Sequence, residues 1–270
     1  IVPWQLLCAR TGATLRVVPI TPAGEVRLED FQAKLNEHTK VVAFAHVSNS
    51  LGTVLPVKAM AELAHQVGAL VVVDGAQGVV HARVDVQDLG ADFYAFSGHK
   101  IYGPTGIGAL YGKRALLEAM PPWRGGGDMI DRVSFAGSTW NDLPYKFEAG
   151  TPNIAGVIGM GAAIDYMEGL GLEAIAAHEA RLLAYGTKRF AELDGVRLIG
   201  TAEPKAGVLV RSTDSFKVLI ECPLIVMLLF QLLLLLRERH RRVHRPRGAH
   251  VDPDVKHERA FRAWAWARCT

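Results

Sequence analysis

Residues 41–45 read Val-Val-Ala-Phe-Ala and residues 70–74 read Leu-Val-Val-Val-Asp, and the chain between them has the pattern of a helix. Residues 41–45 and 70–73 are continuous apolar runs of the length that buried strands have, and Asp74 ends the second run. The helical pattern begins at Pro56 and ends at Gly68, which is the usual order of these two residues. Strand, helix and strand in this order form the unit of a parallel sheet. The sequence therefore predicts an α/β fold with Asp74 at the carboxyl end of a strand, where such sheets bind ligands.

Two further strand candidates follow. Residues 91–96 form one of them, and residues 107–111 form the other. Between them lie Ser97-Gly98-His99-Lys100 and a turn rich in glycine. Residues 121–153 contain many Gly and Pro and are predicted as long loops, which are usually functional in a compact domain.

The chain changes character twice beyond these loops. A helical pattern from residue 153 to about 193 has Gly171 and Gly186 as interruptions, and strand candidates at 196–199 and 207–210 begin a second, smaller domain. We therefore divide the chain into three parts: a large domain (residues 1–152), connecting helices with the start of a small domain (153–210), and an atypical tail (211–270).

One lysine and one aspartate carry the predicted chemistry. Lys100 follows a buried strand, from which its amine can attack an aldehyde. Asp74 can keep a pyridine nitrogen protonated, and a protonated ring stores the electrons released at a substrate's α-carbon. Pyridoxal phosphate (PLP) requires both a lysine that bonds to its aldehyde and an acid that pairs with its ring nitrogen. The sequence therefore predicts PLP as cofactor and Lys100 as the catalytic residue.

Four polar residues near this pair extend the predicted cofactor site. Asn49 and Gln77 are placed to hydrogen-bond the ring hydroxyl. Ser97 and His99 flank a glycine beside the lysine, and with free backbone N–H groups they are suited to hold a phosphate. Taken alone, Asn49 and Gln77 are each more often a turn residue. The glycine cluster at 103–108 matches no nucleotide fingerprint and is interpreted as a tight turn.

Residues from about 1 to 210 resemble the class V aminotransferase family, and within it the Suf-type cysteine desulfurases. The matching segments are His46-Val-Ser-Asn49, Leu51-Gly-Thr53, Val73-Asp-Gly-Ala-Gln77, Phe96-Ser-Gly-His-Lys-Ile-Tyr-Gly-Pro-Thr-Gly-Ile-Gly108, Gly125-Gly-Gly-Asp-Met-Ile130 and Phe147-Glu-Ala-Gly-Thr-Pro-Asn153. The resemblance implies the PLP-dependent transferase fold of type I. This is a mixed, mostly parallel sheet flanked by helices, here with an incomplete small C-terminal domain.

The resemblance also implies roles for single residues and an activity. The implied cofactor contacts are Asn49, Asp74, Gln77, Ser97, His99, Lys100 and Thr151. Lys100 carries PLP, and Thr151 reaches the phosphate of the partner subunit, which implies a homodimer with shared active sites. The implied reaction converts L-cysteine to L-alanine and passes the sulfur to an acceptor protein for iron–sulfur cluster assembly. Alternatives are a selenocysteine lyase or an aminotransferase of the same class, or a non-catalytic fragment.

The chain departs from that family at both ends. Ile1-Val-Pro-Trp-Gln5 resembles the middle of a family domain, so we expect a preceding part, with a histidine stacked on the cofactor and a Gly-Thr phosphate loop, to be missing. After Val210 there is no Arg-x-Gly-x-x-Cys loop, which supplies the sulfur-accepting cysteine in the family. Cys8, Cys222 and Cys269 fit neither a disulfide framework nor a metal site, and none has the surroundings of a catalytic thiol. We therefore expect impaired desulfurase activity.

The tail has three interpretations. Residues 224–236 are apolar apart from one glutamine, but a helix of this length spans about 20 Å and a hydrocarbon core is about 30 Å thick, which argues against a membrane span. Six arginines between Arg237 and Arg247 could contact nucleic acid, but no aromatic platform accompanies them, and residues 1–210 hold 18 Lys or Arg against 21 Asp or Glu. We favour a frameshift near codon 210.

No signal peptide is visible, which with few cysteines predicts a cytoplasmic protein.

Overall fold

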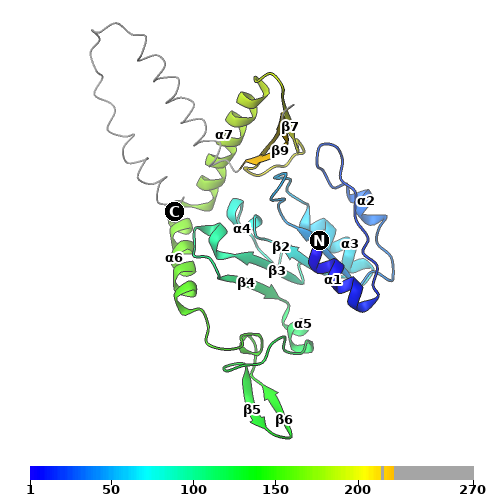
Figure 1. The fold of residues 1–270 in the computed structure, drawn as a ribbon, viewed down its shortest axis with the longest axis vertical. Helices are drawn as coiled ribbons and strands as arrows, with labels where there is room; N and C mark the ends of the chain where they lie inside the picture. The colour runs from blue at the N-terminus through cyan, green and yellow to red at the C-terminus, as the bar shows by residue number, and fades with distance from the viewer. Residues whose placement is uncertain (214–215, 222–270) are drawn as a thin grey trace, which may run out of the picture. The chain divides into compact units, whose positions relative to one another are not determined.

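Helices and strands alternate along most of the chain in the computed structural model, which describes residues 1–213 and 216–221 (Figure 1). The helices are α1 (Val2–Thr11), α2 (Leu28–Gln32), α3 (Val57–Gln66), α4 (Gly78–His81), α5 (Arg114–Ala119), α6 (Ile154–Leu170) and α7 (Leu172–Ala191), with the 3-10 turns η1 (Gly98–Ile101) and η2 (Tyr145–Phe147). The strands are β1 (Val41–Ala45), β2 (Leu70–Asp74), β3 (Phe93–Ser97), β4 (Gly108–Gly112), β5 (Ile130–Ser134), β6 (Gly137–Trp140), β7 (Val196–Ile199), β8 (Leu209–Thr213) and β9 (Phe216–Glu221). The predictions for residues 222–270, with Cys222 and Cys269, lie outside the described residues.

The strands β1 to β4 form one sheet in chain order. β1 and β3 both run parallel to β2, whereas β4 runs antiparallel to β3. The mixed, mostly parallel sheet that the sequence predicts is therefore confirmed, and so is the helix between its first two strands. β3 begins at Phe93, two residues later than predicted, and ends at Ser97.

One face of this sheet is packed against α2 and α3. The buried cluster consists of Phe31, Val57, Met60, Ala61, Ala64, Ala69, Val71, Val73, Ala91 and Tyr94. Successive side chains of a strand point to opposite faces, so Val73 and its cross-strand partner Tyr94 face α3, whereas Asp74 and its partner Ala95 face away. Asp74 is exposed, and so is Leu110, which pairs with Ala95. The sheet thus has a packed face and a second face that carries Asp74.

The predicted loop region at 121–153 contains a hairpin that the sequence did not reveal. β5 and β6 pair in antiparallel fashion and are joined by Phe135 and Ala136 (Figure 1). Every residue of the two strands except Ile130 is exposed. Because neither face is buried, the hairpin lacks the alternation of apolar and polar residues that marks a half-buried strand. The loop prediction is therefore wrong for these two segments.

Two glycines in the predicted helical region behave differently. Gly171 has a φ of 84° and separates α6 from α7, as the sequence predicts. Gly186 lies inside α7, so the predicted interruption is wrong there. A Cβ atom at Gly186 would lie 2.6 Å from Cδ1 of Leu209. The glycine therefore lets α7 approach β8 closely instead of ending the helix.

A second, three-stranded sheet has the order β7-β8-β9, with antiparallel pairs throughout. It confirms the strand predicted at 196–199, and the strand predicted at 207–210 begins at Leu209. Helix α7 packs against β7 and β8. Within the described part of the chain, no helix combines the length and the apolar character needed to cross a membrane.

Asp92 anchors the amino-terminal end of the parallel strands. Its side chain is only 5% exposed. Oδ2 accepts hydrogen bonds from the backbone N–H of Val71 (2.7 Å) and from Nε2 of His65 (2.9 Å). Oδ1 accepts a hydrogen bond from Nζ of Lys113 (2.6 Å). Burial alone would raise the pKa of Asp92, but the hydrogen bonds from Lys113, His65 and the Val71 N–H outweigh it and lower that pKa. Asp92 is therefore an ionised, buried link between three segments.

Asp92→Asn should lower the free energy of unfolding at neutral pH by about 1–3 kcal/mol, because a carboxylate with three donors is replaced by an amide that cannot accept from all of them. The lowered pKa of Asp92 means that this stabilisation is complete above the unfolded-state pKa, about 4, and is lost as pH falls through the folded-state pKa. Urea unfolding near pH 7 and again near pH 3 should show the difference shrinking at acid pH. Asp88→Asn, which removes an exposed ion pair with Lys58, is the control. Equal losses in both variants would contradict the assignment.

Candidate functional site

The candidate site lies where the three parallel strands end at one edge of the sheet. Backbone hydrogen bonds hold these ends together: the N–H of His46 donates to the Asp74 carbonyl and the N–H of Gly75 donates to the Ala95 carbonyl, each over 2.8 Å. The register places Asp74 opposite Ala95. Ser97 is two residues beyond Ala95 on the same strand, so the side chains of Asp74 and Ser97 lie on the same face. The sheet thus brings together predicted site residues from two strands.

The turn after Asp74 is built on two glycines. Oδ1 of Asp74 accepts a hydrogen bond from the backbone N–H two residues on (3.0 Å), which closes a tight turn. A Cβ atom on Gly75 would lie 1.8 Å from Cε1 of Tyr94, and one on Gly78 would lie 2.5 Å from Nδ1 of His46. Only glycine lets the backbone rest directly on these two rings. The position of Asp74 therefore depends on the Tyr94 and His46 rings beneath its turn.

His46 and Tyr94 form an uncharged pair under this turn. Nδ1 of His46 lies 2.9 Å from the Tyr94 hydroxyl, and the two rings meet edge to face at 82° with centroids 6.0 Å apart. Burial lowers the pKa of His46. Burial, and secondarily the negative charge of Asp74, raise the pKa of Tyr94 well above its usual value. Both rings therefore stay neutral near pH 7, and they leave the charge of Asp74 unpaired by a cation.

Lys100 lies on η1, the single 3-10 turn after β3. The N–H of Gly98 donates to the Ile107 carbonyl (2.8 Å), and the N–H of Gly103 donates to the Gly98 carbonyl (2.9 Å), so the turn is tightly closed. The Gly98 N–H is therefore already engaged within the fold. Lys100 is half-buried, and among the described residues its amine has no hydrogen-bond or ion-pair partner. The fold thus holds an unpaired amine in a fixed turn.

The other predicted site residues take up different positions. Ser97 ends β3 and is half-buried, and His99 is exposed on η1. Gln77 is half-buried and immediately precedes α4, and Asn49 is exposed in the turn that follows β1. These four share the edge with Asp74 and Lys100. Thr151 does not follow a strand of this sheet; it is exposed in the segment that leads into α6.

Asn153 ties the Thr151 segment to the turn after Lys100. Its Oδ1 accepts a hydrogen bond from the N–H of Gly156 and so caps α6 (3.0 Å). Its Nδ2 donates to the Gly106 carbonyl (3.2 Å). One side chain therefore sets the start of α6 and fixes it against the glycine-rich turn between η1 and β4.

Lys205 ties the Asn49 loop to the segment before β8. Its Nζ donates to the carbonyls of Leu51 and Gly200, the latter over 2.7 Å. Burial lowers the pKa of Lys205, and nearby Glu203 opposes this shift. The half-buried amine of Lys205 therefore holds the loop that carries Asn49, although Lys205 comes much later in the chain.

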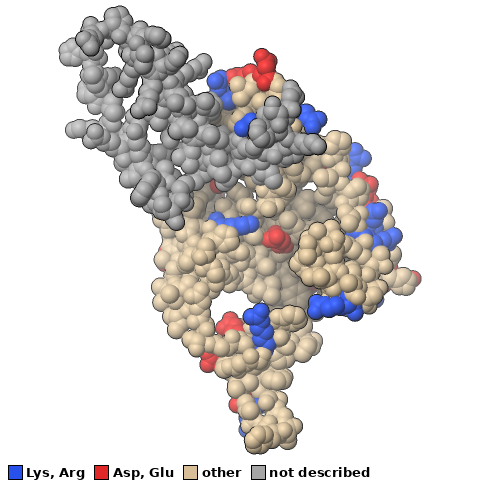
Figure 2. Space-filling view, viewed as in Figure 1, with Lys and Arg blue, Asp and Glu red and all other residues tan. Residues whose placement is uncertain are grey.

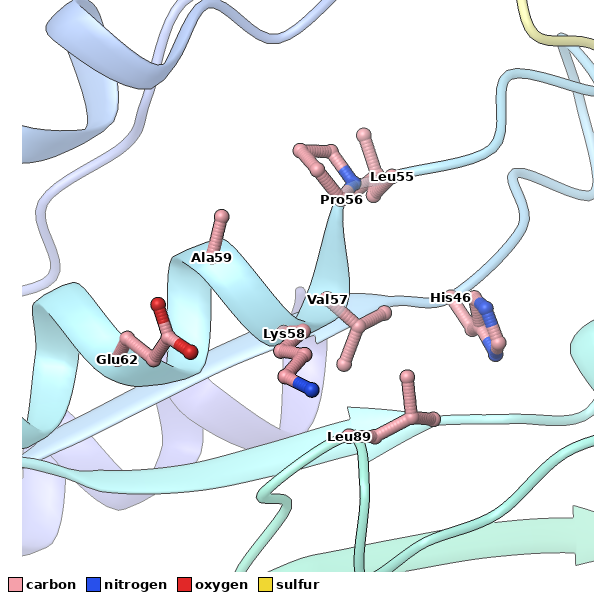
Figure 3. Close-up of a pocket in the computed structure, with 8 residues that line it drawn as sticks. All are labelled: His46, Leu55, Pro56, Val57, Lys58, Ala59, Glu62 and Leu89. Atoms are coloured by element: carbon pink, nitrogen blue, oxygen red, sulfur yellow. The ribbon is translucent and has the colours of Figure 1, made fainter.

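An open cavity of about 450 Å³ lies on the packed side of the sheet, beside the start of α3 (Figure 3). It is lined by His46, Leu55, Pro56, Val57, Lys58, Ala59, Glu62 and Leu89. Figure 3 shows Lys58 and Glu62 on the helix and His46 at the opposite end. None of the predicted site residues lines this cavity, because Asp74 and Ser97 lie on the other face of the sheet. Figure 2 shows acidic and basic side chains interspersed over the described part of the visible face.

Sequence reasoning missed the residues that support the site from below. His46 opens one of the segments that carry the family resemblance, and its ring lies directly beneath Gly78. Tyr94 sits inside a strand and gives no sign of its role. Two glycines three residues apart, Gly75 and Gly78, were the available signal for a close backbone approach. Lys205 could not be found from sequence, because its carbonyl partners are fixed only by the fold.

Comparison with known proteins places the chain in a family. The family model described as aminotransferase class-V matches residues 1–218. A cysteine desulfurase of Synechococcus elongatus is 55% identical over 216 residues, which are 80% of this chain and 34% of that protein. The structure of the cysteine desulfurase CsdA from Escherichia coli has a TM-score of 0.76 at 39% identity, over 79% of this chain and 53% of that chain. A C-DES mutant with glycine covalently linked to its PLP cofactor has a TM-score of 0.70 at 26% identity, over 78% of this chain and 57% of that chain.

These matches confirm the predicted fold, because the neighbours with known structures include PLP-dependent proteins of the same architecture. The chain spans about a third of the length of the Synechococcus protein and about half of the Escherichia coli chain. The family resemblance noted in the sequence is likewise confirmed, since one family model covers most of the residues that the structure describes. The chain belongs to the class-V aminotransferase family.

Proposed function

We propose that this chain binds PLP and serves a cysteine desulfurase reaction, in which L-cysteine becomes L-alanine and the sulfur passes to an acceptor. One observation carries the proposal: a lysine amine, Lys100, and a carboxylate, Asp74, stand at the same edge of one sheet, and neither has an ion-pair partner among the described residues. The similarity to proteins named cysteine desulfurase supports the substrate. Since the chain spans only part of those relatives, the reaction of the whole protein is inferred from them.

The side chains at this edge fit PLP. Asp74 offers a carboxylate to a protonated ring nitrogen, and Gln77 offers an amide to the ring hydroxyl. Ser97 and His99 offer a hydroxyl and an imidazole to the phosphate. When bound, PLP withdraws electrons from the α-carbon of an amino acid substrate.

Lys100 has two tasks in this proposal. Its amine would hold the cofactor and would carry the α-proton of the substrate, and a tightly closed turn without a competing partner among the described residues suits it to both tasks. Asp74 keeps the ring nitrogen protonated. Its Oδ1 is held by the N–H of Ala76, while Oδ2 has no hydrogen-bond partner in the described residues and remains available to a ligand. The turn therefore orients the carboxylate before any ligand arrives.

The finer parts of the proposal come from the resemblance. We propose membership of the Suf-type subgroup, a role in iron–sulfur cluster assembly, a cytoplasmic location and a homodimer in which Thr151 reaches the partner's cofactor phosphate. Asn49 would lie beside the ring. The division at 1–152, 153–210 and 211–270 is retained as a proposal.

Cys8, on α1, is the one cysteine in the described part of the chain, and it is remote in sequence from the strand ends, so we expect weak sulfur transfer.

Lys100→Ala should abolish covalent binding of PLP. The purified chain mixed with PLP should show a visible absorbance band, and borohydride followed by mass spectrometry should find a pyridoxyl group on Lys100. The variant should show neither, because no other amine replaces one held in this turn. Lys58→Ala, which removes an exposed lysine of the cavity rim, is the matched control and should keep both signals. A band that survives in Lys100→Ala would refute the assignment.

Asp74→Asn should slow exchange of the α-hydrogen of L-alanine with deuterated water by about 100-fold, because the ring nitrogen loses its anionic partner. The exchange needs no sulfur acceptor, so it tests Asp74 separately from desulfuration. Asparagine keeps an oxygen for the Ala76 N–H, so the turn should survive the substitution. Nuclear magnetic resonance of the alanine signal measures the rate. An exchange rate equal to that of the wild type would show that Asp74 does not contact the ring.

A further inference from the structure

His81 and Glu179 form a partly buried pair that joins α4 to α7. Nδ1 of His81 lies 2.6 Å from Oε2 of Glu179, and the two side chains are 14% and 23% exposed. Nε2 of His81 is buried and has no hydrogen-bond partner among the described residues. A single contact therefore sets the orientation of this ring, with Nδ1–H donating to the carboxylate.

The pair acts on the turn that carries the proposed cofactor contacts. Gln77 immediately precedes α4, and His81 is its last residue. A helix of four residues cannot hold its own position, so it depends on contacts with the rest of the fold. At one end Gly78 rests on His46 and Tyr94, and at the other end His81 is held by Glu179. The two ends together fix where Gln77 and the preceding turn stand.

The same pair connects this turn to the second sheet. Glu179 lies in α7, which packs against β7 and β8. The close approach of Gly186 to Leu209 makes that packing tight. A displacement of α7 therefore reaches α4 through the His81–Glu179 contact.

We propose that His81 and Glu179 are positioning residues, which hold α4 so that Gln77 and Asp74 meet the cofactor ring and which link that geometry to the small sheet. The inference rests on the proposed function for its ligand, but the immobilised turn can be measured in the protein without PLP. Neither residue contacts the cofactor in this proposal.

The test compares variants of the 270-residue chain that break the pair with variants that keep it. His81→Leu and Glu179→Leu remove the hydrogen bond, and His81→Asn keeps a donor near the position of Nδ1. We expect the two leucine variants to raise the dissociation constant of PLP, followed by its absorbance band, by about tenfold. His81→Asn should restore most of the affinity, and the double leucine variant should be no worse than either single one.

Hydrogen exchange without PLP gives the second readout. Amides of residues 75–82 should exchange about tenfold faster in the leucine variants, since the turn loses its tether. His65→Leu is the matched control, because it breaks another histidine–carboxylate pair, with Asp92, at the opposite end of the sheet. It should lower the melting temperature and leave both PLP affinity and exchange at 75–82 unchanged.

Several results would overturn the proposal. The first is that the amides of residues 75–82 exchange in the leucine variants at the wild-type rate. The second is that His65→Leu lowers PLP affinity as much as His81→Leu does. If the wild-type chain binds no PLP, the proposed function fails, and exchange alone then decides the positioning role. If His81→Leu does not fold, Glu179→Leu provides the same comparison from the other partner.

Discussion

The parallel alignment of β1, β2 and β3 is the constraint on which the rest of the structure depends. Parallel strands end at the same edge, and backbone hydrogen bonds from His46 to Asp74 and from Gly75 to Ala95 extend the pairing beyond the strands themselves. Three loops that are distant in sequence thus leave the sheet side by side. The pairing of the strands brings a carboxylate, a hydroxyl and an amine to this edge.

The charged side chains at the two ends of the sheet differ in how they are paired. At the amino-terminal end Asp92 has a partner for each oxygen, and its donors neutralise it. At the carboxyl end the charged groups of Asp74 and Lys100 have no ionic partners among the described residues. Satisfied buried groups stabilise a fold, whereas unsatisfied ones near a surface are available to a ligand. The same strands therefore join a stabilising cluster at one end to the candidate site at the other.

The sequence predicts those parts of the molecule in which local pattern and burial agree. The β1–α3–β2 unit has continuous apolar strands and a helix bounded by proline and glycine, so its placement and that of Asp74 could be predicted. The β5–β6 hairpin could not, because both of its faces meet water and no periodicity results. Gly186 was mistaken for a helix end, since only its contact with Leu209 explains it. The supports of the site, such as Tyr94 beneath Gly75 and Lys205 on Leu51, are long-range contacts that leave no local trace.

The chain order of the first sheet has a consequence for how the protein is made. Each of the strands β2 to β4 pairs with the strand before it, so no strand of this sheet waits for a partner from later in the chain. The loop of Asn49 is different, because the amine that holds it comes from Lys205, 154 residues after its partner Leu51. The strands of this sheet thus find their partners within residues 41–112, whereas the loop of Asn49 is held only once the segment before β8 has been added.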